Sequence, residues 1–295
     1  MLFRLPRRLQ LRLKQAVGKL LFDLIEPHRK SAALSEVHHT QSLRADGDRL
    51  SPQQLRLLTS YQDDTMDVEA RKRYFATSDH TRTMHGIVVP LLKQLLDGDS
   101  SIRSTLNIGC NYAYMDAQLS KAYPQVLFQG VDVNPRLTDL NADLLSANLK
   151  LQPGYALDLL EAGGLKADLA YFSSTATAIR MGELKRYLRI LSTTAKYVVF
   201  SEPIWPMPDG QRPIPTAISP ELSLPVHLQR HSDTQAIGYV CYAHNYRALL
   251  EEAGFDVFSY RAYRPDFATL DWVLTAGQNR NQRLWAAPSQ SGPAA

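Results

Sequence analysis

The sequence predicts an α/β fold: five strands joined by helical crossovers, a terminal antiparallel hairpin, and a helical N-terminal extension. Two observations carry this prediction. After Ser104, short apolar runs alternate with amphipathic helical segments, which is typical of a parallel sheet with helical crossovers. The last two apolar runs are joined only by "RPDF", and this leaves no room for a crossover helix, so they must pair as an antiparallel hairpin.

The N-terminal segment predicts a basic amphipathic helix between Pro6 and Pro27. Leucines recur at helical spacing, and the basic residues fall largely on other faces. Residues 7–25 could therefore contact an anionic membrane surface. The alternative is that the apolar stripe packs on the domain or on a second subunit. The whole leader, residues 1–60, is predicted to be this helix followed by a polar segment.

The charge distribution argues against nucleic-acid binding. Residues 1–30 carry eight Lys or Arg against Asp23 and Glu26, a net of +6, so the formal +4 of the whole chain leaves −2 for the rest. A mildly acidic body is a poor match for neutralising phosphates. Only Cys110 and Cys241 are present, and no metal-ligand spacing occurs, so no disulfide framework and no metal site are predicted. No apolar run is long enough to span a bilayer, and we expect a cytoplasmic protein, with peripheral membrane contact left open.

The elements of the domain follow in order, starting with a helix that ends at Asp-Gly-Asp, residues 97–99. Its apolar residues should face a core: Ile87, Val88, Leu91, Leu92, Leu95 and Leu96. Strands are predicted at 104–110, 126–133, 151–157, 167–173, 195–203, 255–263 and 270–277. Helices are predicted at 115–124, 136–149, 182–194 and 245–254. Together, residues 61–279 form the predicted domain, and residues 280–295 a flexible tail.

Residues 206–244 form a proline-rich insertion within the domain. Its prolines should prevent regular structure and favour an ordered lid over the edge of the sheet. Histidines and aromatic residues give it the composition of a small-molecule pocket. His244 and His231 are the candidate catalytic bases, because histidine is the natural base near neutral pH, although each of them could instead be a bystander.

Two strings carry a resemblance to a known family. "LNIGCNYAYM", residues 106–115, places a glycine turn after the first strand, and "FQGVDVNP" ends the second strand in an acid, Asp132. From Met84 to Gln278 the order of elements resembles the class I S-adenosylmethionine-dependent methyltransferases. The resemblance implies a Rossmann-like seven-stranded mixed sheet with helices on both faces and an antiparallel last strand. The resemblance implies that S-adenosylmethionine is the cofactor. The residues expected to bind it are Asn107, Gly109, Asn111, Asp132, Asp158 and Ser173.

The glycine turn departs from the family's acid-x-Gly-x-Gly-x-Gly pattern. Only Gly109 is a glycine; Asn111 is among the few residues that tolerate a left-handed conformation, and Ala113 stays small. Asn107 replaces the acid, and its amide oxygen can still accept a hydrogen bond from the cofactor's amino group. A dinucleotide dehydrogenase would need Gly-x-Gly-x-x-Gly, which is absent.

Asp132 and Asp158 have different expected partners. A carboxylate at Asp132 suits two ribose hydroxyls, and a helix cap is the structural alternative. The resemblance implies that Asp158 contacts the adenine amine. The sequence thus predicts methyl transfer to an oxygen of a small or lipid-linked metabolite, a sugar or natural product. The alternative is a noncatalytic binding or scaffold protein of the same fold that docks through its N-terminal helix.

Overall fold

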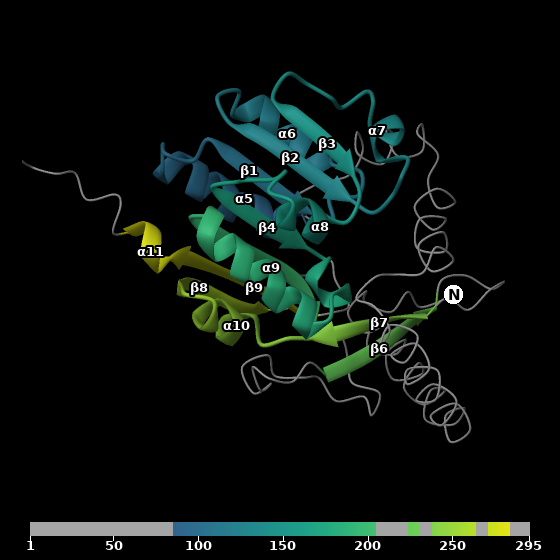
Figure 1. Ribbon diagram of the computed structural model, residues 1–295, viewed down its shortest axis with the longest axis vertical. Coiled ribbons are helices and arrows are strands. Elements are labelled where there is room, and N and C mark those ends of the chain that lie inside the picture. Colours follow the sequence, from purple (N-terminus) through teal and green to yellow (C-terminus); the bar gives the residue numbers. More distant parts are fainter. Residues whose placement is uncertain (1–84, 205–223, 231–237, 264–270, 284–295) are drawn as a thin grey trace, which may run out of the picture. The chain divides into compact units, whose positions relative to one another are not determined.

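The computed structural model describes residues 85–204, 224–230, 238–263 and 271–283. Their centre is a seven-stranded sheet in the order β3-β2-β1-β4-β5-β9-β8 (Figure 1). The strands are β1 (Ser104–Ile108), β2 (Leu127–Asp132), β3 (Leu149–Pro153), β4 (Leu169–Ser173), β5 (Tyr197–Ile204), β8 (Phe255–Tyr263) and β9 (Asp271–Asn279). The first five are parallel, and β9 lies antiparallel between β5 and β8.

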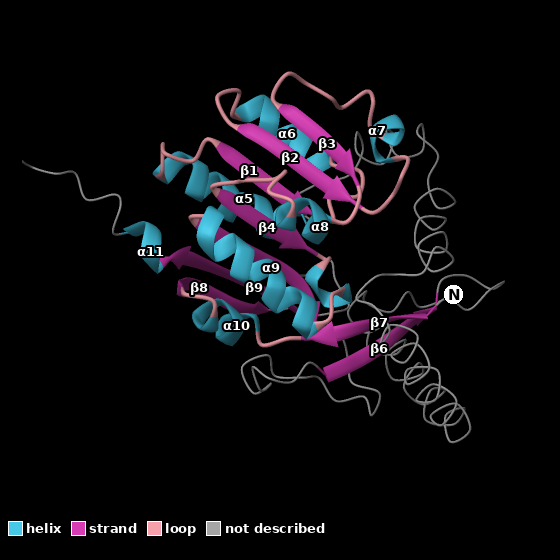
Figure 2. Cartoon of the chain, in the orientation of Figure 1, coloured by secondary structure: helices cyan, strands magenta, loops and turns pink. Residues whose placement is uncertain are grey.

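Helices cover both faces of this sheet, as Figure 2 shows. One face packs against α5 (His85–Gly98) and α6 (Tyr114–Ala122). The other packs against α8 (Ala156–Glu161), α9 (Met181–Thr194) and α10 (Tyr246–Glu252). The short helices α7 (Leu137–Leu140) and α11 (Arg280–Arg283) follow β2 and β9. The predicted sheet with helices on both faces is therefore confirmed.

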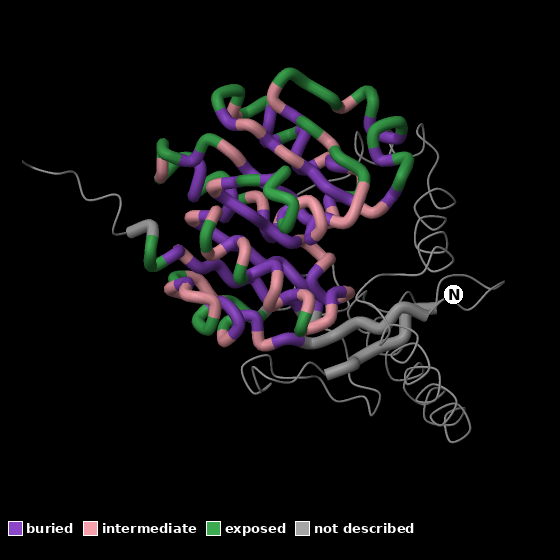
Figure 3. The backbone as a smooth tube through the Cα atoms, viewed as in Figure 1, coloured by how far each residue is buried: buried purple, intermediate pink, exposed green. Residues whose placement is uncertain are grey.

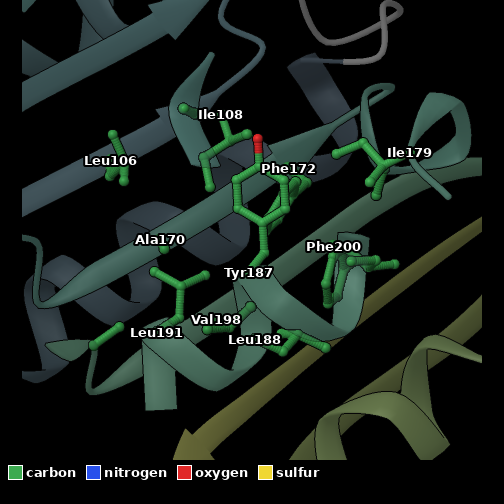
Figure 4. Packing of buried hydrophobic residues seen from close by; sticks show 14 of the residues in the cluster. Leu106, Ile108, Ala170, Phe172, Ile179, Tyr187, Leu188, Leu191, Val198 and Phe200 are labelled. Carbon is green, nitrogen blue, oxygen red and sulfur yellow. The ribbon is translucent and has the colours of Figure 1, made fainter. Parts of the chain in front are cut away.

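The two cores follow from the alternation of side chains along the strands. In β4, Ala170 and Phe172 join the core under α8 to α10, whereas Leu169 and Tyr171 join the core under α5 and α6. In Figure 3 most of the central strands are buried, and many of the exposed residues lie on the helices and loops around them. In the first core, Phe172 stacks on Phe200 at 4.8 Å between ring centroids, and the leucines of α9 pack over them (Figure 4).

The predicted first helix and the terminal hairpin are confirmed. Helix α5 ends at Gly98, and its six predicted apolar residues are all buried. The hairpin pairs β8 with β9, with a register irregularity between Val257 and Ser259. Because both predictions rested on short-range spacing, they did not depend on how the rest of the chain packs.

Two predicted boundaries around the third strand are wrong. A helix was expected over 136–149, but α7 ends at Leu140. There the buried Asn141 donates its Nδ2 to the Leu137 carbonyl at 2.7 Å, and this side-chain bond takes the place of a further helical turn. The strand expected at 151–157 is β3, which ends at Pro153. Gly154 follows at φ +141°, and the next apolar residues face the core from α8 instead.

The proline-rich insertion also differs from its prediction. Regular structure was not expected within 206–244, yet β6 (Leu224–Arg230) and β7 (Gly238–Ala243) form a two-stranded antiparallel sheet. The physical reason is the distribution of proline: within the insertion, none occurs after Pro225, where the pairing shifts register. Strand β7 lies beside the 3₁₀ helix η2 (Ala176–Ala178) that follows β4.

Several predictions fall outside the described residues. These are the leader 1–60 with its helix at 7–25, the lid segment before β6, and most of the tail 280–295. His231 also lies outside them. Within the described part of the chain, no helix combines the length and hydropathy needed to cross a membrane.

Candidate functional site

The carboxyl ends of β1, β2, β4 and β5 meet at one edge of the sheet. The chain order reverses beside β1: β2 and β3 lie to one side of it, and β4 and β5 to the other. In open α/β sheets, ligands bind at such a switch point, just beyond the carboxyl ends of the strands. The predicted cofactor residues Asn107, Gly109, Asn111, Asp132 and Ser173 all come from the ends of these strands or from the turns that follow them.

The turn after β1 uses left-handed backbone at alternate residues. Gly109 has φ +75°, Asn111 +49° and Ala113 +45°. These are the three positions of the triple-glycine pattern. Gly109 keeps the glycine, and Asn111 adopts the left-handed conformation that it is predicted to tolerate. Ala113 loses no side-chain entropy but adopts a conformation that costs an L-residue about 1–2 kcal/mol. The turn closes when Gly109 and Cys110 both donate their N–H groups to the Val131 carbonyl, at 2.8 and 3.1 Å.

Gly109 is also required by close packing. A Cβ at this position would lie 2.3 Å from Oγ1 of Thr175, in the loop after β4. The Thr175 hydroxyl in turn lies 3.2 Å from the Gly109 carbonyl, which can accept its hydrogen bond. The glycine turn and the loop after β4 are therefore in direct contact, which brings the ends of β1 and β4 together.

Asp132 ties the second strand to the glycine turn. Its Oδ2 accepts from the Asn111 N–H at 2.9 Å, and its Oδ1 accepts from the Asn134 N–H at 3.0 Å. The side chain is only 7% exposed. The structural alternative is thus partly realised, because Asp132 accepts from the turn that precedes α7. The carboxylate is held in one orientation at the switch point, as a ribose-binding group would need.

Three buried polar side chains, from β1, β4 and α6, meet through hydrogen bonds. Asn107 of β1 donates its Nδ2 to Oδ2 of Asp116 at 2.7 Å, and the Tyr171 hydroxyl of β4 donates to Oδ1 of the same carboxyl. Asp116 belongs to the first turn of α6 and is fully buried. Burial raises its pKa to about 6, although the hydrogen bonds from Tyr171 and Asn107 oppose this.

The loop after β4 is held from below by a second buried acid. Glu202, near the end of β5, is fully buried. Its Oε1 accepts from the N–H groups of Thr175 and Ala176, at 3.2 and 3.0 Å, and its Oε2 accepts from Thr177 at 3.2 Å. Desolvation raises the pKa of Glu202 to about 7 in spite of these three donors. The carboxyl group thus fixes the start of η2.

His244 holds the other end of the same loop. It is 2% exposed, and its Nε2–H donates to the Ile179 carbonyl at 2.9 Å. Its ring lies edge-on to Tyr246, at 5.4 Å between centroids. Burial lowers the pKa of His244 to about 4. The ring is therefore neutral near pH 7, with Nε2–H committed to the backbone, and this geometry favours a positioning role over the predicted proton-accepting one.

We expect His244→Phe to destabilise the fold by about 1–3 kcal/mol at pH 7.5, because the Ile179 carbonyl loses its buried donor while the ring packing is kept. The folded pKa of His244 is depressed, so its contribution to stability is full above about pH 6.5 and is lost as the pH falls through about 4. Urea unfolding of both proteins between pH 7.5 and 4.5 should show the difference shrinking. A difference that stays constant with pH would argue that His244 titrates normally.

Three predicted site residues remain: Ser173, Asp158 and His231. Ser173 ends β4, and its Oγ is buried without a hydrogen-bond partner among the described residues. Asp158 lies in the first turn of α8, half-buried, beyond the end of β3. His231 lies outside the described residues, so its place relative to the site is not described.

Sequence reasoning missed Asp116 and Glu202. Glu202 carries the signal that identified Asp132, an acid at the end of an apolar strand, and could have been found in "VVFSEP" by the same rule. Asp116 carries no such signal. An acid in the first turn of a helix is ordinary, and only the packing of α6 against β1 and β4 shows that it is buried.

Known structures share this architecture. No family model matches the chain, and no curated protein matches it significantly in sequence. Magnesium protoporphyrin IX methyltransferase (ChlM) from Synechocystis PCC 6803, solved with bound S-adenosylmethionine, is similar with a TM-score of 0.50 and 14% identity, over 79% of this chain and 100% of that one. The N-methyltransferase NodS from Bradyrhizobium japonicum WM9, solved with S-adenosyl-L-homocysteine, also has a TM-score of 0.50, with 13% identity over 75% of this chain and 98% of that one.

These likenesses agree with the strand order and with the antiparallel β9, which were established from the pairing of the strands alone. At such low identity they bear on the fold and not on the substrate. The chain has the fold of the class I S-adenosylmethionine-dependent methyltransferases.

Proposed function

We propose that this protein binds S-adenosylmethionine at the carboxyl edge of the sheet and transfers its methyl group to an acceptor. The observation that carries the proposal is the arrangement around Asp132. Its carboxylate is buried, oriented by backbone N–H groups on both oxygens, and joined to a left-handed turn in which a Cβ at Gly109 would clash with Thr175. A ribose binding here would meet a preoriented acceptor, which lowers the cost of ordering the site.

The polar atoms at this edge fit the cofactor. Asn107 Oδ1 and Ser173 Oγ are buried and have no hydrogen-bond partner among the described residues. A buried acceptor without a donor costs about 1–3 kcal/mol, so such atoms are favoured where a ligand supplies the missing partner. Asn107 Oδ1 suits the ammonium group of the methionyl part, Asp132 the ribose hydroxyls, and Asp158, beyond β3, the adenine amine.

The bound cofactor would supply an activated methyl group on its sulfonium. The chain then has to hold the acceptor in line with that group, which can contribute about 7–11 kcal/mol of rate enhancement. The loop after β4 is suited to this task because Glu202 and His244 fix it from two sides. Rigid support of a loop at the reacting edge keeps the geometry within the narrow range that methyl transfer needs.

For the acceptor, we propose an oxygen of a small or lipid-linked metabolite, a sugar or natural product. Supporting this, β4 ends at Ser173 and is followed by Ser174 and Thr175, where an Asn/Asp-Pro-Pro-aromatic motif would mark methylation of an amino group in adenine or glutamine. His231 stays a proposed base for the hydroxyl proton. Labelled S-adenosylmethionine, incubated with the protein and a cell extract, should identify the product.

The cofactor is tested first, by calorimetry with S-adenosyl-L-homocysteine. We expect a dissociation constant in the micromolar range, on the order of −8 kcal/mol. Asp132→Ala should weaken binding at least about tenfold, since it removes the ribose acceptor and frees the turn. Asp139→Ala, an exposed acid on the nearby α7, is the control and should change little. Neither heat nor a thermal shift with the wild-type protein would exclude the enzyme and favour the noncatalytic scaffold.

A further inference from the structure

Asp116 is a buried carboxyl group near the carboxyl edge of the sheet, where the cofactor is proposed to bind. The function proposed above does not use it. It lies in the first turn of α6, the helix that directly follows the glycine turn, and it is fully buried. Both of its oxygens accept hydrogen bonds, from Asn107 of β1 and from Tyr171 of β4. In the register of the sheet, Asn107 is directly opposite Tyr171, so the two donors approach the carboxyl group side by side.

This contact decides which way the amide of Asn107 points. An ionised carboxylate can only accept hydrogen bonds, so it selects the Nδ2 of Asn107, at 2.7 Å. The carbonyl oxygen, Oδ1, must then face the opposite way. Asn107 is 3% exposed, and its Oδ1 has no hydrogen-bond partner within the described ranges. The side chain therefore presents one buried acceptor at the end of β1.

The same contact explains why position 107 carries an amide. An aspartate at this position would place two buried carboxylates in contact with each other, and like charges in such a site cannot both ionise. With Asn107, the pair keeps a single negative charge, on Asp116, and the neutral amide keeps one buried acceptor, Oδ1, near the carboxyl end of β1. The charge is thereby carried by the helix behind the strand and not by the strand itself.

We propose that Asp116 is a positioning residue that orients Asn107, so that Asn107 Oδ1 accepts a hydrogen bond from the ammonium group of S-adenosylmethionine. The inference rests on the proposed function, because it names the part of the cofactor that this pair binds. The negative charge of Asp116, which is hydrogen-bonded to the Nδ2 of Asn107, also favours a cation at Asn107 Oδ1.

An exchange of the two residues tests this directly. In the double variant Asn107→Asp/Asp116→Asn, the amide now on α6 would donate to the carboxylate now on β1 and accept from Tyr171. Every hydrogen bond of the network is then preserved, with the donor and acceptor roles of the pair reversed. In Asp116→Asn alone, two amides face each other, the orientation of Asn107 is no longer imposed, and the negative charge is lost. The single variant should therefore lose affinity for the ammonium group, and the exchanged pair should regain it.

The measurement is binding of two ligands by calorimetry at pH 7.5. S-adenosyl-L-homocysteine carries the ammonium group, and 5′-deoxy-5′-methylthioadenosine keeps the adenosine but lacks the amino-acid part. For Asp116→Asn we expect affinity for the first ligand to fall at least about tenfold and affinity for the second to change less than about twofold. The exchanged pair should return to within about threefold of the wild type for the first ligand.

Asp168→Asn is the matched control. Asp168 also binds β1, by accepting from the N–H groups of Arg103 and Ser104 at 2.8 and 2.9 Å, but it does so at the opposite end of the strand. This variant should leave the ratio of the two affinities unchanged, even if it lowers the thermal midpoint. Should Asp116→Asn not fold, the exchanged pair still tests the inference, through the ratio of its two affinities.

The outcomes separate the inference from the proposed function. Equal losses for both ligands in Asp116→Asn, or no rescue by the exchange, would overturn the positioning role and leave a structural one. Wild-type protein that binds the methylthioadenosine but not the homocysteine ligand would overturn the ammonium site alone. Wild-type protein that binds neither ligand would overturn the proposed function itself.

Discussion

Gly109→Ala is expected to destabilise the protein by about 2–5 kcal/mol and to weaken binding of S-adenosyl-L-homocysteine at least about tenfold. Two effects add. The positive φ of +75° costs an L-residue about 1–2 kcal/mol, and the new Cβ would sit 2.3 Å from Thr175 Oγ1, so overpacking adds about 1–3 kcal/mol. The loop after β4 has to move, and it lies at the edge where the cofactor is proposed to bind. Urea unfolding and calorimetry measure the two losses.

Gly163→Ala separates these two effects. Gly163 has a similar φ of +71°, is exposed, and would place its Cβ within 4 Å of nothing. It should cost only the conformational part, about 1–2 kcal/mol, and leave ligand binding intact. The double variant Gly109→Ala/Thr175→Ala should recover part of the stability, because the two closest clashing atoms are gone. Equal losses for Gly109→Ala and Gly163→Ala would show that the contact with Thr175 is unimportant.

Glu202→Leu should cost on the order of 3–5 kcal/mol, because three backbone N–H groups of the loop after β4 lose their buried acceptor together. Glu202→Gln keeps one carbonyl oxygen and should cost less. Denaturant unfolding of the three proteins at pH 6 ranks them. A leucine variant as stable as the wild type would mean that the loop finds other acceptors, or that η2 is not needed for the fold.

The pH dependence of Glu202 gives a second test of the same contact. Its folded pKa is raised from 4.5 to about 7, so its stabilising contribution is full below about pH 4.5 and is lost as the pH rises through about 7. The stability of the wild type relative to Glu202→Gln should therefore fall by about 3 kcal/mol over this range. The contributions of His244 and Asp116 cancel in this difference. A flat difference would contradict the raised pKa.

The sequence by itself determined the order along the chain of the elements of the seven-stranded sheet, the terminal hairpin, the glycine turn and the acid at the end of β2, but not the strands β6 and β7. All of these depend on residues close together in the chain: the period of apolar residues, a linker too short for a crossover, and left-handed conformations open to glycine and asparagine. The predicted ends of the helix at 136–149 and of the strand at 151–157 were wrong because they were inferred from local pattern alone. There a tertiary contact, the burial of Asn141, overrides a local helical pattern.

Only the tertiary structure decided how the candidate site is supported. Asp116 and Tyr171 are 55 residues apart, Glu202 and Ala176 are 26, and His244 and Ile179 are 65. Burial and hydrogen bonding set whether a carboxyl or imidazole group serves as a ligand, a base or a support, because desolvation and the available donors determine its charge and its free lone pairs. For that reason His244, which the sequence suggested as a base, is a neutral ring that donates a hydrogen bond to the backbone. Asp116, which the sequence did not single out, accepts a hydrogen bond from Asn107.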